Sequence, residues 1–258
     1  MKLLRALWVQ FRQMLSWQLA LCGFLAALMM ELSVAGIIAD HISGKAAYTS
    51  VWYLINSTGT NLLTLFVLPT LPFAMSLAQD WEARATPYWA AREGIARYTM
   101  SKLLASAMAG FLTVGLGLAL FVLANGTYLP WFHPCTSVDY EALFEAGHIF
   151  LGWLCYILHM ALSGAMIGAL GMFMSIFVPN QFVAISAPLA IHLTVLRVMP
   201  TNLISPVSVW YPINWVEGIH YTASPGLTLL GKFLLTAGFC VLMCAAGCVW
   251  MKRRFERG

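Results

Sequence analysis

The sequence predicts an all-helical, polytopic membrane protein, and three observations lead to this fold class. Of the 258 residues, 60% are hydrophobic and only 9% are charged, the mean hydropathy is +0.78, and several apolar runs exceed the roughly 20 residues needed to cross a bilayer. Soluble domains carry about 25% charged residues, so this chain has less than half the charge of a water-exposed surface. The composition excludes a cytosolic globular protein, a disordered chain and a nucleic-acid-binding protein, which would carry far more Lys and Arg.

The apolar runs predict one membrane domain over residues 1–258. At about 20 residues for each crossing, six crossings leave no room for a separate soluble domain. Residues 2–15 place apolar side chains at helical spacing and point Lys2, Arg5 and Arg12 elsewhere, which is typical of an elbow helix lying in the membrane interface. The six transmembrane helices are expected at about 17–39, 57–78, 103–124, 149–178, 182–199 and 227–251.

Two segments depart from a pattern of straight crossings. Pro69 and Pro72 fall inside the second crossing, and each removes a backbone donor, so this helix is expected to kink. Residues 200–226 hold four prolines, two tryptophans and two tyrosines. This stretch is too broken for one helix and too apolar for a free loop. We therefore expect short re-entrant helices at the membrane boundary, where Trp and Tyr are enriched, before the sixth crossing.

The positions of the basic residues predict the orientation. With six crossings and a cytoplasmic N-terminus, all but three of the 14 Lys and Arg residues fall on the cytoplasmic side, the exceptions being Lys45, Arg197 and Lys232. Membrane proteins retain an excess of Lys and Arg in their cytoplasmic segments. The sequence therefore predicts a multi-pass protein of the cell membrane with both termini in the cytoplasm.

Small residues indicate helix packing faces rather than a metal site. Cys240, Cys244 and Cys248 recur every fourth residue and so share one helix face, but no His or carboxylate accompanies them as a further ligand. In the fourth crossing, close contact with a neighbouring helix is expected at Gly164, Gly168 and Gly171.

A nucleotide-binding site is not expected in this chain. Residues 226–233 match most of a phosphate-binding P-loop, but Phe233 stands where a Ser or Thr would hold magnesium, and no strand precedes the motif. We expect Lys232 instead to extend its ammonium group toward water at the mouth of the sixth crossing.

Neither a protease nor a haem protein is favoured. Ser163 and His159 share one helix rather than facing each other across a cleft, and the nucleophile elbow of serine hydrolases is absent. Haem ligation would need two His residues at matching depth on facing helices, whereas His148 lies at a membrane boundary. We expect no catalytic residue, metal or cofactor in the chain itself.

Glu31 is the most costly residue of the first crossing, since an ionised carboxylate near the bilayer centre costs roughly 2–3 kcal/mol. It either reaches the outer interface, or is protonated, or forms a polar point on a substrate pathway. Arg197, near the end of the fifth crossing, is a possible partner on such a pathway.

The most informative segment is the loop 79–102, which carries seven charges in 24 residues. Its apolar and aromatic residues lie among charges of both signs, as in a short amphipathic helix. Aromatic and Arg side chains dominate the energetics of protein interfaces, so the loop predicts a docking surface. The alternative is a helix lying flat on anionic lipid, against which the mixed charge argues. The candidate docking residues are Trp81, Glu82, Arg84, Tyr88, Trp89, Arg92, Glu93 and Tyr98.

This layout resembles the membrane subunit of the ABC-2 type (type V exporter-like) ABC transporters. Those permeases have an elbow helix, six crossings, a coupling helix between the second and third, and re-entrant helices before the sixth. The counterparts here are the segments 2–15, 79–102 and 200–226.

Two short motifs also resemble that family. Arg92-Glu93-Gly94 followed by Tyr98 and Lys102 is similar to a run that many small bacterial members carry at the start of the third helix. The turn at Pro179-Asn180 and the proline at position 188 are similar to the family's fifth helix.

The resemblance implies an export permease of a bacterial cell membrane that is not itself an enzyme. A separate ABC ATPase subunit would bind ATP and Mg²⁺ and dock under the loop 79–102, and the permease would act as a homodimer or pair with a similar permease. The expected cargo is apolar or amphipathic: an antimicrobial peptide, a drug or a lipid-like molecule. The alternative is a secondary transporter or another ion-driven six-helix carrier; a secondary transporter would favour charged residues at the midplane and inverted repeats.

Overall fold

The computed structural model describes residues 2–44, 49–57, 63–133, 140–198, 215–216 and 224–257. The structure is 85% helical, and no strand occurs in the described segments, which confirms the all-helical fold class. The elements in chain order are α1 (Lys2–Met14), α2 (Trp17–Ile42), α3 (Val51–Ser57), η1 (Leu63–Val67), η2 (Leu68–Thr70), α4 (Ser76–Glu82), α5 (Thr86–Glu93), α6 (Ile95–Asn125), α7 (Glu141–Glu145), α8 (Ile149–Phe177), α9 (Gln181–Val198) and α11 (Pro225–Arg257).

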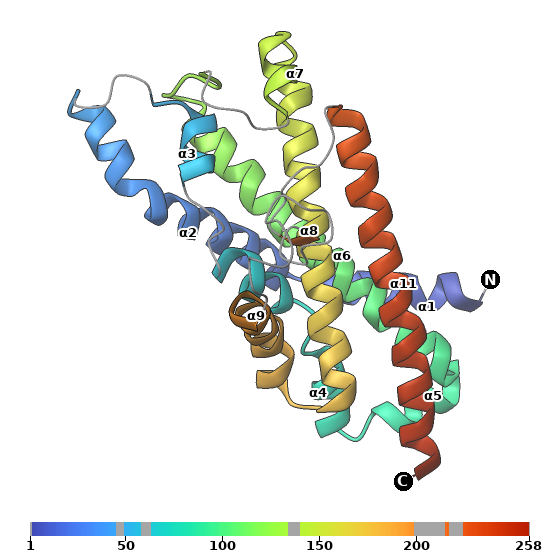
Figure 1. The fold of residues 1–258 in the computed structure, drawn as a ribbon. Coiled ribbons are helices and arrows are strands. Elements are labelled where there is room, and N and C mark those ends of the chain that lie inside the picture. Colours follow the sequence, from blue (N-terminus) through green and yellow to red (C-terminus); the bar gives the residue numbers. More distant parts are fainter. Residues whose placement is uncertain are drawn as a thin grey trace.

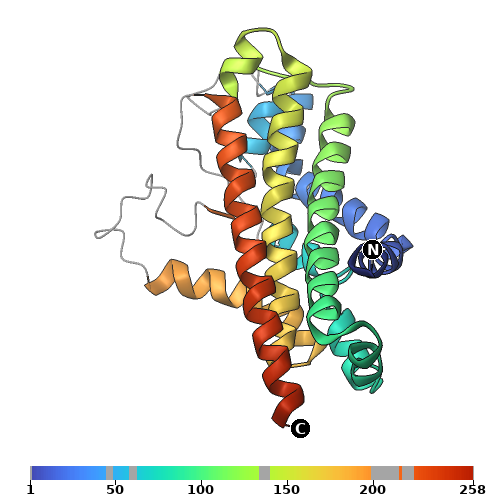
Figure 2. The same cartoon turned by 90° about the vertical axis from the view of Figure 1, so that its right-hand side faces the viewer.

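Within the described residues, four helices are long and apolar enough to cross a membrane: α2, α6, α8 and α11. They coincide with the crossings predicted at 17–39, 103–124, 149–178 and 227–251. Three of them are longer than predicted, because α2 continues to Ile42, α6 already begins at Ile95 and α11 continues to Arg257. In Figures 1 and 2, α6, α8 and α11 run side by side along the length of the molecule.

The second predicted crossing, 57–78, is interrupted rather than gently bent. Its described part is a π-helical turn, η1, followed by a 3₁₀ turn, η2, and then by α4. The interruption lies at Pro69 and Pro72, which cannot donate the backbone hydrogen bonds that a continuous α-helix needs. The prolines therefore break the helix at the place where the sequence predicts a kink.

The fifth predicted crossing, 182–199, corresponds to α9, which contains Pro188. Its apolar stretch is shorter than those of the four long helices. Figure 2 shows the second half of α9 lying across the direction of α6, α8 and α11. The predicted re-entrant helices at 200–226 lie outside the described residues except for 215–216 and 224–226.

Helices α6 and α8 approach so closely that only glycine fits at their contact. A Cβ atom added at Gly110 would lie 2.1 Å from the carbonyl oxygen of Gly164, and one at Gly164 would lie 2.4 Å from the carbonyl oxygen of Gly110. One added at Gly168 would lie 2.4 Å from the carbonyl oxygen of Ser106, whose hydroxyl donates to the Gly168 carbonyl at 2.8 Å. Small residues of this kind permit helix association in lipid, and the close contacts predicted at Gly164 and Gly168 are confirmed. The third predicted glycine, Gly171, contacts α9 instead, where an added Cβ atom would lie 2.6 Å from the carbonyl oxygen of Ala184.

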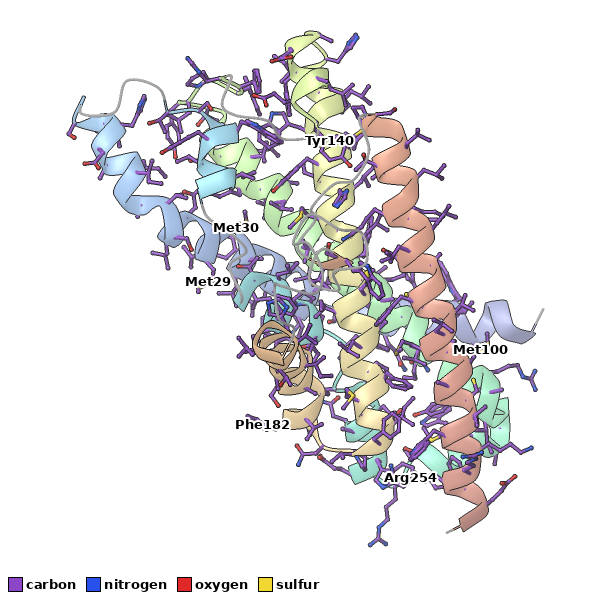
Figure 3. The ribbon with its side chains drawn as sticks, viewed as in Figure 1. Met29, Met30, Met100, Tyr140, Phe182 and Arg254 are labelled. Carbon is purple, nitrogen blue, oxygen red and sulfur yellow. The ribbon has the colours of Figure 1, made fainter. Side chains whose placement is uncertain are left out.

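The two ends of the bundle differ. As labels, we call the end with α7 the outer end and the end with the C-terminus the inner end. The outer end holds α7 and an aromatic cluster in which the Trp52 ring lies 4.8 Å from Phe144 and 5.5 Å from Trp153. The inner end holds α4, α5 and the C-terminus. Figure 3 shows Tyr140 near the outer end and Arg254 at the inner end.

Helix α1 lies across the long helices and is seen end-on in Figure 2. Ala6, Gln10 and Met14, spaced four residues apart, are buried, and the helix packs on α6. Trp8 on another face is 65% exposed. This orientation and this division of faces fit a helix that lies in a membrane interface.

The close contact of α6 with α8 makes a prediction about stability. Gly164→Ala should lower the free energy of unfolding by about 1–3 kcal/mol, because the added methyl group overpacks the backbone of α6. The matched control is Gly238→Ala in α11, where nothing lies within 4 Å of the new atom and where the helix propensity of Ala should raise stability by about 0.5–1 kcal/mol. Thermal unfolding of the purified variants in detergent measures both effects, and equal unfolding temperatures would contradict the packing described.

Candidate functional site

The strongest candidate for a functional site is the inner hairpin, which we define as residues 76–102. The sequence predicts one short amphipathic helix within 79–102. The structure corrects this: α4 continues to Glu82, α5 occupies Thr86–Glu93, and α6 already begins at Ile95. Pro87, in the first turn of α5, favours a helix start there, and two sharp turns separate the three helices.

The first turn, between α4 and α5, has an arginine in a left-handed conformation, with φ at +54° for Arg84. The N–H of Ala85 donates to the carbonyl of Asp80 at 2.8 Å, and the N–H of Arg84 donates to the carbonyl of Trp81 at 3.0 Å. This pair of bonds is the Schellman motif that often ends a helix, and its left-handed residue is usually glycine.

At two other helix ends in this chain, the left-handed residue is a glycine. Gly44 after α2 and Gly147 after α7 have positive φ angles of 75° and 81°, and Arg84 is the single non-glycine residue with positive φ in the described segments. A left-handed conformation costs a side-chain-bearing residue roughly 1–2 kcal/mol. Arg84 therefore carries a conformational cost that a glycine would not.

The second turn, between α5 and α6, is at Gly94, whose φ of +87° disfavours any side chain. The N–H of Gly94 ends α5 by donating to the carbonyl of Ala90, and the carbonyl of Gly94 accepts from the N–H of Tyr98 at the start of α6. Gly94 is the glycine of the Arg92-Glu93-Gly94 run, and its positive φ angle explains why a glycine occupies this position.

The hairpin is held together by a cluster around Asp80, which we call the Asp80 cluster. The Lys102 ammonium lies 2.9 Å from the Asp80 carboxylate, and the Tyr98 hydroxyl donates to the same carboxylate at 2.6 Å. Lys102 is only 4% exposed, and its ammonium lies 5.2 Å from the centre of the Phe73 ring. A charge so enclosed needs a partner to remain ionised. The cluster thus joins α4 to α6 on either side of α5.

Trp81 is held by the C-terminal end of α11. The guanidinium of Arg254 lies 4.1 Å from the centre of the Trp81 ring and donates to the carbonyl of Ile176 at 2.7 Å. Ile176 lies in the last turn of α8, where unpaired carbonyls and the helix dipole attract a cation. One arginine therefore connects the inner ends of α4, α8 and α11.

These contacts narrow the predicted docking surface. Tyr98 is 1% exposed, and Trp81 and Trp89 are half-buried against the inner core, so these three aromatic residues support the hairpin from within. The side chains that remain exposed are those of Glu82, Arg84, Tyr88 and Arg92. We call Arg84, Tyr88 and Arg92 the exposed tip.

The acidic and basic side chains of the hairpin differ in their contacts. Asp80 pairs with Lys102, Glu82 accepts a hydrogen bond from Gln181 Nε2 at 2.7 Å, and Glu93 is half-buried with one carboxylate oxygen enclosed. Arg84 and Arg92 form no ion pair within the described residues, although the Arg92 guanidinium lies 5.8 Å from the centre of the Trp89 ring. The exposed surface of the hairpin therefore carries two arginines without an ion pair and one tyrosine, beside the hydrogen-bonded carboxylate of Glu82.

Helix α5 is separated from α1 along the length of the bundle. In Figures 1 and 2, α5 lies farther toward the inner end than α1, on the side of the C-terminus.

Among the described residues, Glu31 is hydrogen-bonded to the outer end of α6. It accepts a hydrogen bond from Asn125 Nδ2 at 2.5 Å, and Asn125 Oδ1 accepts from the Tyr128 hydroxyl at 2.5 Å. Burial, and then the nearby Glu31 carboxylate, raise the pKa of the Tyr128 phenol above its ordinary value. The side chain of Arg197, the predicted partner, lies outside the described residues. Glu31 thus connects α2 to α6 at the outer end.

The sequence predicts that Lys232 extends its ammonium group to water, and this prediction is wrong. Lys232 is fully buried and donates a hydrogen bond to the carbonyl of Trp215, because the outer part of α11 packs against α8 and residues 215–216. The P-loop-like residues 226–233 lie inside the helix α11 and do not form a phosphate-binding loop.

Other catalytic arrangements gain no support from the described residues. No group of three or more His, Cys, Asp or Glu residues that could hold a metal occurs among them. Ser163 and His159 lie on one helix, as the sequence predicts, and His159 Nδ1 lies 3.0 Å from the Tyr140 hydroxyl. No family model, curated protein or solved structure matches this chain.

The Asp80 cluster predicts a measurable coupling between two residues. Lys102→Met should lower the free energy of unfolding by about 2–3 kcal/mol, somewhat less than the roughly 3–5 kcal/mol of a fully enclosed pair, because Asp80 is 26% exposed. Adding Asp80→Asn to Lys102→Met should cost little more, since the carboxylate then has no cation to lose.

The control for this prediction is Lys252→Met, because Lys252 forms an exposed i,i+4 pair with Glu256 and should contribute less than about 0.5 kcal/mol. A double-mutant cycle on thermal unfolding, with limited proteolysis of the hairpin as a second readout, measures the coupling. Strictly additive effects of the Asp80 and Lys102 variants would show that the two residues do not act together.

Proposed function

We propose that this chain is the membrane-spanning permease subunit of an ATP-driven exporter of the ABC-2 type. The observation that carries the proposal is the exposed tip, Arg84, Tyr88 and Arg92, held on a rigid base at the inner end of the bundle. In this role the tip docks into a groove on a separate ATPase subunit, which binds ATP and Mg²⁺.

The base of the hairpin is suited to transmit force. The Asp80 cluster ties α4 to α6, and Arg254 ties α4 to the inner ends of α8 and α11. Since α6, α8 and α11 are among the four long apolar helices, a displacement of α5 would move much of the bundle together. A hairpin that only connected two crossings would not need these contacts.

The proposed topology assigns the described helices to parts of a six-crossing permease. In this topology the second crossing comprises α3 to α4, the fifth begins with α9, α1 is the elbow helix, and both termini are cytoplasmic. One such chain is half of a transporter, so it pairs with a second copy or with a similar permease in the cell membrane. The cargo is apolar or amphipathic, and the transport is outward.

A secondary transporter is the second candidate. One observation favours it: Lys232 is buried at membrane depth within electrostatic range of His159, and ionisable residues in such positions mark ion pathways in many transporters. The two candidates differ in their energy source, so an ion gradient would drive one and ATP the other.

Co-purification tests the proposal. The affinity-tagged chain is expressed in its native host, and the proteins that it retains in mild detergent are searched for a P-loop ATPase. Stoichiometric recovery of the ATPase, and ATP hydrolysis that increases on complex formation, support the proposal. Active transport by the chain alone in proteoliposomes, driven by an ion gradient, would falsify it.

The exposed tip predicts which residues matter for coupling. Arg92→Ala and Tyr88→Ala should each reduce recovery of the ATPase, and the affinity should fall by roughly tenfold or more, because Arg and Tyr are among the residues that contribute most to interfaces. Arg12→Ala is the control, since Arg12 is an exposed cation on α1 and is not part of the hairpin. The unfolding temperatures of all three variants should stay near that of the wild type.

Arg84 offers a test in which stability and coupling change in opposite directions. Arg84→Gly should raise the free energy of unfolding by about 1 kcal/mol, because glycine removes the cost of the left-handed conformation. The same variant should weaken ATPase recovery, since the cation is lost, whereas Arg84→Lys should retain part of it. An Arg84→Gly variant that couples as well as the wild type would remove Arg84 from the docking surface.

A further inference from the structure

A second buried lysine lies in the outer half of the bundle and has no carboxylate partner among the residues that the structure describes. Lys232 is fully enclosed, and its described contact is the single hydrogen bond to the carbonyl of Trp215. An ammonium group carries three donors. No described Asp or Glu forms an ion pair with Lys232. An enclosed cation of this kind needs an anion to remain ionised.

Two hydroxyl groups near Lys232 in the fold are also unsatisfied. Thr236 lies one turn after Lys232 on α11, and Ser163 lies one turn after His159 on α8. Both hydroxyls are enclosed, and neither has a hydrogen-bond partner in the described part of the chain. Because α8 and α11 pack together and His159 lies within electrostatic range of Lys232, the two helix faces lie at similar depth.

The same two helix faces lead to an apolar cavity. Phe239 follows Thr236 by one turn on α11, and Ile167 follows Ser163 by one turn on α8; both line a cavity of about 210 Å³. Its walls also include Phe66 from η1, Leu170 from α8, and His192 from α9, whose ring lies 4.0 Å from that of Phe66. An apolar cavity of about 150 Å³ already accepts benzene, so this one holds a short hydrocarbon segment.

One residue joins the polar and apolar parts. Trp215 lines the cavity, and its carbonyl accepts the hydrogen bond from Lys232. The donor group of Lys232 and the hydrocarbon walls of the cavity thus meet at Trp215. Donors without an acceptor indicate that an anion completes the polar end, and the cavity indicates that this anion carries an apolar tail.

We propose that Lys232, Ser163 and Thr236 bind the anionic head of an amphipathic molecule, a carboxylate or phosphate group, whose hydrocarbon tail occupies the cavity lined by Ile167, Leu170 and Phe239. The site does not depend on an ATPase partner, so it stands or falls separately from the transport proposal. The ligand is either a resident lipid or fatty acid of the membrane, or a cargo molecule that exchanges.

Binding of two probes of equal tail length tests the site. The purified chain in phosphatidylcholine nanodiscs is titrated with decanoate and with decanol, and ligand affinity is obtained from the shift in unfolding temperature. The wild type should bind decanoate at least about tenfold more tightly than decanol, because hydrogen bonds to charged groups contribute about 1.5–3 kcal/mol. Equal affinity for the two probes overturns the proposal.

Variants assign the preference to named residues. Lys232→Gln should bring the decanoate-to-decanol ratio close to one, whereas Lys252→Gln, an exposed lysine on the same helix, should leave it unchanged. Thr236→Val, which keeps the shape of the side chain, should weaken decanoate several-fold and serves if Lys232→Gln does not fold. Leu170→Trp should weaken both probes by filling the cavity. A preference that survives Lys232→Gln or Thr236→Val places the anion elsewhere.

Mass spectrometry of the purified protein distinguishes the two sources. An anionic lipid or fatty acid that co-purifies with the wild type, but not with Lys232→Gln, identifies a resident membrane ligand. Binding of added decanoate without a co-purified molecule identifies an exchanging ligand. If the wild type neither retains an anionic amphipath nor binds decanoate, the site does not exist as proposed.

Discussion

The arrangement of the inner end depends on the ion pair between Lys102 and Asp80. Lys102 lies on a long apolar helix among aromatic rings, where a cation without a partner is costly, so the carboxylate at the end of α4 must lie against α6. This constraint sets the position of α5 between them and lets Trp81 meet Arg254. The broken second crossing, the hairpin and the inner end of α11 are thereby held in one arrangement.

The acidic and basic side chains of the hairpin differ in their contacts. Asp80 is paired with Lys102 and Glu93 is half-buried, whereas Arg84, Arg92 and the hydrogen-bonded Glu82 are exposed. The two buried lysines differ in one respect, because Lys102 has an internal carboxylate and Lys232 has none among the described residues. The first joins α4 to α6, and the second makes one described hydrogen bond, to the carbonyl of Trp215, which is why we propose a ligand there.

Much of the fold could be predicted from the sequence because it depends on local patterns. Apolar length places α2, α6, α8 and α11, prolines 69 and 72 break the second crossing, and the glycines of α8 mark its contact with α6. The rest depends on contacts between segments far apart in the chain. Neither Asp80 with Lys102 nor Trp81 with Arg254 has a sequence spacing that reveals it, and Lys232 resembles an interfacial lysine until its packing on Trp215 is seen.

The central claim is that the exposed tip of the hairpin contacts a separate ATPase. Site-specific photocrosslinking in intact membranes tests it most directly, with a photoreactive amino acid placed at Tyr88 in the tip or at Tyr128 at the outer end, both exposed positions. The account predicts a covalent adduct with a P-loop ATPase from position 88 and none from position 128. Adducts from position 88 that contain only lipid, or no ATPase, would contradict it.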